Sequence, residues 1–118
     1  GDQLPLDFLL FMRVQMLRPS DFDRYGLLGN GKPISLKNEL DALRRAMVTL
    51  RKELNTYPTS IDEDHYLLAR QGGLGRREAF AVVYRLGEKQ VLYDNMQTAV
   101  DMWNSLLVHG FDERSEKL

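Results

Sequence analysis

Hydrophobic side chains along this chain recur mainly every three or four residues, which is the spacing of one face of an α-helix. The clearest run follows Ser35, a residue type that caps helix N-termini, and stops at Tyr57-Pro58, because a residue before proline disfavours the helical conformation. The run is shorter than three heptads, which is more typical of the inward face of a bundle than of a coiled coil. We therefore predict a helix that buries one stripe of side chains: Leu36, Leu40, Leu43, Met47, Leu50 and Leu54.

A shorter apolar helix is expected before this one. Pro5 suits its first turn, and Arg18-Pro19 marks its end, since proline lacks an amide proton and restricts the residue before it. A short helical turn is then predicted over 21–25, closed by Gly26, and a glycine-rich loop over 27–34.

The longest helical pattern begins near Arg76 and continues for about thirty residues. Gly87 lies inside it, where glycine costs about 1 kcal/mol relative to alanine, so we expect close packing, a kink or a break at that point. No stretch has the alternation of a strand. The sequence therefore predicts an all-α fold for a single domain over 1–118, a helical bundle of about four to five helices with one long C-terminal helix. Its apolar positions are Phe80, Val83, Leu86, Val91, Leu92, Met96, Ala99, Val100, Trp103, Leu106 and Leu107.

Size and composition exclude several classes of protein. The chain has 118 residues, enough to bury a core, and its 43% hydrophobic and 28% charged residues are ordinary globular values. A net charge of -1 supplies no global attraction to nucleic acid or to an anionic membrane, and no apolar run approaches the ~20 residues of a bilayer span. The absence of cysteine excludes disulfides, thiolate zinc sites and cysteine nucleophiles. The start, Gly1-Asp2-Gln3, lacks an initiator methionine, so we expect a piece of a longer protein.

An acidic stretch over 59–68, TSIDEDHYLL, raises the question of a metal or acid-base site. Ser60 and Glu63 have the S-x-x-E spacing of a capping box, in which each side chain binds the other residue's backbone amide. Asp62 and His65 have a spacing that could share a metal ion, but one imidazole and one carboxylate make half a site. We therefore interpret the stretch as a helix start, with negative charge favoured in its first turn at Asp62, Glu63 and Asp64.

Other sequence patterns do not indicate catalysis. Residues 26–33, GLLGNGKP, match the phosphate-loop pattern G-x-x-x-x-G-K-[ST] except at the last position, where Pro33 offers neither a hydroxyl nor an amide proton. His65 and His109 are each isolated in the sequence, and no G-x-S-x-G motif occurs. We therefore expect no catalytic, cofactor-binding or metal-binding residues in this chain.

Five residues are predicted to contact a partner. Two pairs of arginines, at 44–45 and 76–77, stand on two predicted helices. Such charges normally form a solvated helix face, and if they bind a partner, nucleic acid is the alternative to protein. Trp103 has two interpretations. It is either an exposed residue that anchors a partner or a core residue, since its helical spacing matches that of Met96, Val100 and Leu107. These predicted partner-binding residues are Arg44, Arg45, Arg76, Arg77 and Trp103.

Three pieces of the sequence, in order, resemble one family. The leucine-striped helix comes first, followed by residues 57–64, YPTSIDED, and, some twenty-five residues later, by 84–92, YRLGEKQVL. The second piece is similar to a threonine-rich turn with I-E-E-D, and the third to an R-L-G-E-K-x-[IV]-L helix, in the C-terminal substrate-binding domain of SET-domain methyltransferases related to Rubisco large-subunit methyltransferase. The motif residues, to which we assign structural roles, are Thr59, Ser60, Asp62, Glu63, Asp64, Arg85, Gly87, Glu88 and Lys89.

The resemblance implies a helical, non-enzymatic module that follows a catalytic SET domain and holds a protein substrate or complex subunit. S-adenosylmethionine is then expected only in a SET domain outside this chain, whose motifs are missing here, and no membrane contact is implied. Some members of this group are plastid proteins, and one is a component of the plastid transcriptionally active chromosome. The resemblance therefore implies a plastid location, in the chloroplast stroma, with a nucleic-acid-associated role in a transcription complex as the alternative.

Overall fold

The computed structural model describes residues 4–70 and 73–110. The described residues contain five helices and no strand, which confirms the predicted all-α bundle with a long C-terminal helix. The helices are α1 (Leu6–Gln15), the 3₁₀-helix η1 (Pro19–Asn30), α2 (Leu36–Leu54), α3 (Ile61–Ala69) and α4 (Arg76–His109).

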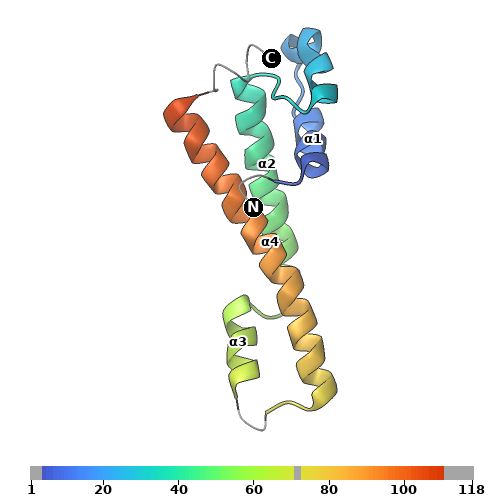
Figure 1. The fold of residues 1–118 in the computed structure, drawn as a ribbon, viewed down its shortest axis with the longest axis vertical. Helices are drawn as coiled ribbons and strands as arrows, with labels where there is room; N and C mark the ends of the chain where they lie inside the picture. The colour runs from blue at the N-terminus through green and yellow to red at the C-terminus, as the bar shows by residue number, and fades with distance from the viewer. Residues whose placement is uncertain (1–3, 71–72, 111–118) are drawn as a thin grey trace.

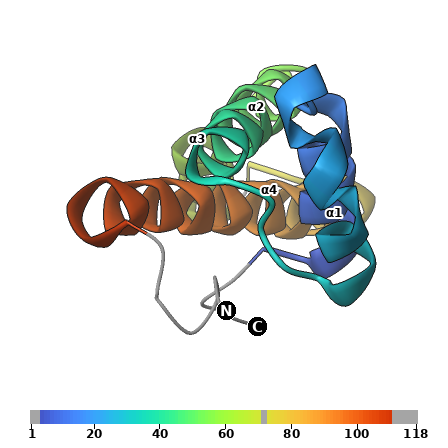
Figure 2. The ribbon, with the colours of Figure 1, turned by 90° about the horizontal axis from the view of Figure 1, so that it is seen from above.

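The molecule is elongated, with extents of 60 × 24 × 19 Å. Figure 1 shows α4 running along almost the whole length, with α2 beside its second half, α1 on the other side of α2, and α3 beside the first half of α4. Seen from above in Figure 2, α2, α1 and α4 surround a shared interior. None of the helices within 4–70 and 73–110 has the length and hydropathy that crossing a bilayer would require.

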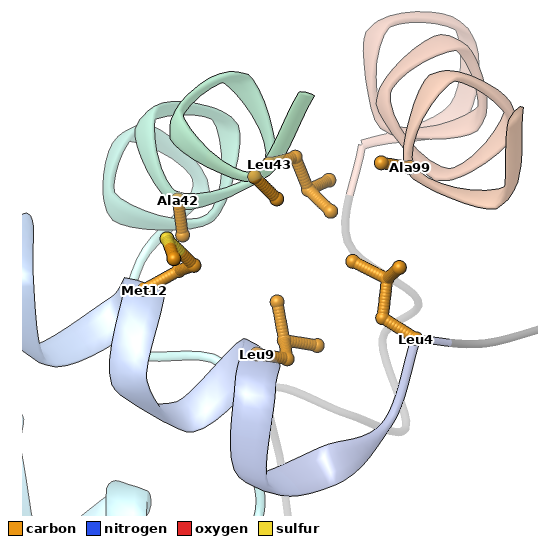
Figure 3. Close-up of a cluster of buried hydrophobic side chains, with 7 residues drawn as sticks. Leu4, Leu9, Met12, Ala42, Leu43 and Ala99 are labelled. Carbon is orange, nitrogen blue, oxygen red and sulfur yellow. The ribbon is translucent and has the colours of Figure 1, made fainter. Parts of the chain in front are cut away.

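The apolar core lies between α1, α2 and the second half of α4. Figure 3 shows Leu9 and Met12 of α1 facing Ala42 and Leu43 of α2, with Leu4 pointing into the gap toward α4. Small side chains at the centre allow the helix backbones to approach closely, since they leave little volume to fill. The buried cluster consists of Leu4, Leu9, Met12, Ala42, Leu43, Ala46 and Ala99.

Helix α2 begins and ends where the sequence predicts, but a different face is buried. Ser35 caps it by accepting a hydrogen bond from the Asn38 amide at 3.0 Å. The predicted leucine stripe is wrong at its start, since Leu36 is 40% exposed, and only Leu43 and Leu50 of that stripe are fully buried. Because α2 packs against α1 on one side and α4 on the other, the buried face widens to include small and polar residues: Asn38, Glu39, Ala42 and Ala46.

A buried ion pair joins α1 to α2. The Arg13 guanidinium donates two hydrogen bonds to Glu39, from Nε to Oε1 at 2.7 Å and from Nη2 to Oε2 at 2.8 Å, and both side chains are nearly inaccessible. Asn38 adds a hydrogen bond from Nδ2 to the Arg13 carbonyl oxygen at 3.0 Å. A bidentate arrangement fixes orientation as well as distance, so this pair sets how α1 lies across α2.

The segment between α1 and α2 is more helical than predicted. We expected a turn closed by Gly26 and then a loop, whereas η1 continues to Asn30. The reversal comes at Gly31, whose φ of 69° lies in the left-handed region that favours glycine. Asp21 is buried here and accepts hydrogen bonds from the Arg18 amide and the Ser35 hydroxyl. These bonds hold η1 against the start of α2.

Helix α4 continues through Gly87 without a break, so the expected split at that position is wrong. Gly87 is exposed, and a Cβ atom built on it would meet nothing within 4 Å. Packing within this chain therefore does not require a glycine there. The predicted apolar pattern also overstated burial, since four of its members are more than half exposed: Phe80, Val83, Val91 and Leu107.

Substitution Gly87→Ala should stabilise the domain in dilute solution. Alanine in an exposed helix interior is favoured over glycine by about 1 kcal/mol, and the added methyl group meets no neighbour in the chain. Urea denaturation followed by circular dichroism should show this gain in the free energy of unfolding. A loss of stability would mean that the glycine fills a packing requirement inside the domain.

Candidate functional site

Lys89 connects the two sequence motifs that lie far apart in the chain. It projects from α4 toward the turn before α3 and the first turn of α3, and its side chain is only 2% exposed. The ammonium group makes an ion pair with Oδ2 of Asp64, which is 3% exposed. It also donates hydrogen bonds to the carbonyl oxygen of Thr59 at 2.9 Å and to the Thr59 hydroxyl at 3.0 Å.

This network surrounds the buried cation with oxygen atoms. The ammonium group donates two hydrogen bonds to Thr59 and is ion-paired with Oδ2 of Asp64. The Thr59 hydroxyl donates a hydrogen bond of 2.6 Å to Oδ1 of Asp64, which closes a ring of interactions. A buried charge is costly unless it is paired and hydrogen-bonded, so all three groups depend on one another.

The pKa of Asp64 is shifted by opposing effects. Burial of the carboxyl group would raise this pKa, but hydrogen bonds from Lys89 and Thr59, with the charges of Lys89 and Arg85, outweigh burial and lower it. The carboxylate is therefore ionised in the folded protein at neutral pH, as the ion pair requires.

The aromatic ring of Tyr57 also lies close to the buried cation. The centre of its ring lies 5.4 Å from the Lys89 ammonium group, within the range of a cation–π contact. Its hydroxyl donates a hydrogen bond of 2.8 Å to Glu88, and this bond raises the pKa of Tyr57 because the bond favours the protonated phenol. Residues 57–64 and 84–92 thus meet through two neighbouring residues of α4, Glu88 and Lys89.

The capping box predicted at the start of α3 is confirmed. The Ser60 hydroxyl accepts from the Glu63 amide at 3.1 Å, and the Glu63 carboxylate accepts from the Ser60 amide at 3.3 Å. The explanation of Asp64 as a helix-start charge was incomplete, because this carboxylate is buried and bound to Lys89. A signal for this contact was present in the sequence: Lys89 lies three residues from both Leu86 and Leu92, on the side of α4 that faces the domain.

A pocket of about 580 Å³ opens beside this network, where the end of α2, the start of α3 and the middle of α4 meet. Its apolar lining includes Leu54, Pro58 and Ile61, and the carboxylates at its edge, Asp62 and Glu63, are exposed. Lys89 also lines the pocket, but its charge is already paired with Asp64. The pocket therefore combines apolar walls with a negative edge. Its complete lining is Leu54, Asn55, Tyr57, Pro58, Thr59, Ser60, Ile61, Asp62, Glu63, Lys89, Gln90 and Tyr93.

The predicted partner-binding residues are not gathered at this pocket. Arg44 and Arg45 are exposed on α2 and line a second pocket of about 310 Å³ with Met16, Asp41 and Val48. Arg76 and Arg77 are exposed in the first turn of α4, at the end that lies beside α3 in Figure 1. Trp103 is half-buried and packs against the core cluster, in agreement with its interpretation as a core position.

The remaining chemistry of the described residues is sparse. Within 4–70 and 73–110, no three His, Cys, Asp or Glu side chains are placed to hold a metal ion together. His65 and His109 are both exposed, on different helices. Arg85, from the third motif, is exposed and donates from Nε to the carbonyl oxygen of Ala81 at 3.4 Å.

Comparison with known families identifies the domain. Residues 1–92 match the family described as Rubisco LSMT substrate-binding, and this range includes both motifs that Lys89 joins. Since the match covers most of the chain, the protein belongs to this family of substrate-binding domains. No curated protein and no solved structure matched the chain.

Substitution Asp64→Asn should destabilise the fold in a pH-dependent way. At neutral pH it leaves the Lys89 charge buried without a counter-charge, which typically costs about 3–5 kcal/mol. The pKa of Asp64 is lower in the folded state, so the ion pair stabilises fully above the ordinary carboxyl pKa of about 3.9 and is lost as pH falls further. Denaturation curves at successive pH values should show the difference from wild type shrinking only below about pH 4.

The matched control is Asp62→Asn, which removes an exposed first-turn charge and should cost less than about 1 kcal/mol. If Asp64→Asn does not fold, the double variant Asp64→Leu with Lys89→Met removes both charges and should recover much of the lost stability. Equal effects of Asp62→Asn and Asp64→Asn would contradict a special role for the buried pair.

Proposed function

We propose that this domain is a non-catalytic module that holds a protein substrate or complex partner for a SET-domain methyltransferase-like parent protein, at the pocket between α2, α3 and α4. One observation carries the proposal: both family motifs frame this pocket, and the buried Lys89 network locks them together beside it. The family match to a substrate-binding domain supports the same function.

The chemistry of the pocket favours a particular kind of protein segment. Leu54, Pro58 and Ile61 offer an apolar surface, and Asp62 leaves an accessible negative charge at the edge. A segment with an apolar side chain next to a basic one would fit both features. Because the Lys89 network already fixes the frame, little ordering would be needed on binding, which lowers the entropic cost.

In this proposal the chain supplies binding and orientation only. S-adenosylmethionine would bind in a SET domain outside the chain, which would also perform methyl transfer. By the resemblance of its motifs to the family, we propose a plastid setting for the parent protein, in the chloroplast stroma. A nucleic-acid role has weaker support, since the accessible charge at the pocket edge is negative and the chain carries a net charge of -1.

Titration with designed peptides tests the proposal. Short synthetic peptides with leucine or phenylalanine beside lysine or arginine, and matched peptides with glutamate in place of the basic residue, would be added to isotopically labelled protein. We expect the basic set to shift the backbone resonances of Tyr57, Ile61 and Tyr93. Asp62→Lys should weaken this binding about tenfold, a loss of about 1.4 kcal/mol, because it reverses the charge at the pocket edge.

The matched control is Asp101→Lys, the same charge reversal at an exposed position of α4 outside the pocket. It should leave the affinity nearly unchanged. Equal weakening by the two variants, or equal binding of the acidic peptides, would count against a protein-binding role for this pocket.

A further inference from the structure

The side of α4 that faces away from the pocket carries an apolar stripe. Its members are spaced alternately three and four residues apart, as in the seam of a coiled coil. Phe80 is 73%, Tyr84 65% and Val91 59% exposed, so the described residues leave most of their surface uncovered. Successive helix residues differ by about 100°, so Gly87 and Lys89 point in nearly opposite directions. The outer stripe consists of Arg77, Phe80, Tyr84, Gly87, Val91 and Asp94.

Gly87 lies at the centre of the apolar part of the outer stripe. The contacts of the described residues do not explain why a glycine occupies this position. It weakens the helix, and a Cβ atom on it would meet no neighbour within 4 Å. Glycine on a helix surface allows the backbone of another element to come unusually close. The position therefore indicates close approach by a second molecule at this point of α4.

We propose that the outer stripe pairs with the same stripe of a second copy of this chain, with the two α4 helices antiparallel. In this register Tyr84 lies over the partner's Gly87, so a large side chain packs where the glycine has no side chain. Phe80 meets the partner's Val91, and both contacts occur twice because the arrangement has two-fold symmetry. Every apolar member of the outer stripe then has a partner.

Charge complementarity selects this orientation. Arg77 precedes the apolar residues and Asp94 follows them, and both are exposed. An antiparallel pair places each Arg77 beside the partner's Asp94, whereas a parallel pair would place arginine against arginine and aspartate against aspartate. Val83, which is 54% exposed, flanks the stripe and widens the apolar contact. The pocket faces the other way, so the pairing does not depend on the function proposed for the pocket.

Sedimentation equilibrium of the 118-residue chain, from micromolar to hundreds of micromolar concentration, tests the pairing. We expect a concentration-dependent dimer. Arg77→Asp or Asp94→Arg alone should weaken dimerisation at least tenfold, because each places like charges together at both ends of the interface. The double variant Arg77→Asp with Asp94→Arg should recover dimerisation, which a general effect of surface charge would not do.

Phe80→Lys should abolish the dimer, while Tyr66→Lys, which alters another exposed aromatic residue, on α3, should leave it intact. Circular dichroism would verify that each variant is folded. A wild-type chain that stays monomeric at every concentration, or a double variant that does not recover, would overturn the proposal.

Disulfide formation tests the orientation, since the chain has no cysteine of its own. When Phe80→Cys and Val91→Cys variants are mixed and oxidised, we expect mainly the mixed dimer, identified by mass spectrometry. Val108→Cys, at a more exposed position of α4 outside the outer stripe, should not cross-link to either. Preferential coupling of each variant to itself would indicate a parallel pair and would refute the antiparallel register.

Discussion

The buried pair between Lys89 and Asp64 is the contact on which the α3 end of the molecule depends. The apolar core lies between α1, α2 and the second half of α4, and α3 does not contribute a buried hydrophobic residue to it. Instead, an ammonium group from α4 is satisfied by oxygen atoms from the turn and the first turn of α3. A buried ion pair of this kind adds little stability compared with apolar side chains at the same positions. Its directional contacts, however, allow α3 to pack on α4 in one orientation only.

A buried ion pair also positions a short helix at the α1 end of the molecule. The pairing of Arg13 with Glu39 fixes α1 on α2 as the pairing of Lys89 with Asp64 fixes α3 on α4. In each case a short helix lies against a long one and the charged groups are almost fully buried. Directional polar contacts therefore position the outer helices, while small apolar side chains such as Ala42 and Ala46 let the long helices pack.

Sequence reasoning found the elements because their limits are local. Ser35, Ser60 and the prolines act on the residues next to them, so the helix boundaries and the capping box could be predicted. The buried faces could not, because they depend on how many neighbours a helix has: α2 lies between two others, so Asn38 and Glu39 are inside while Leu36 is not. Both buried ion pairs were missed for a related reason: the spacing of Lys89 from Leu86 and Leu92 indicates only which side of α4 it occupies, and the partner of a buried charge is known only from the fold. Of the motif residues, Asp64 and Lys89 were thus identified by resemblance, and their contact was revealed by the geometry.

The division of α4 between two sets of neighbours has a mechanical consequence. Its second half shares a hydrophobic core with α1 and α2, whereas its first half is held mainly by α3 through polar contacts. Local opening has a free energy set by the contacts that must be broken, so the two halves need not open together. The second half of α4 is therefore held in place by the hydrophobic core, whereas its first half can change position when α3 is displaced.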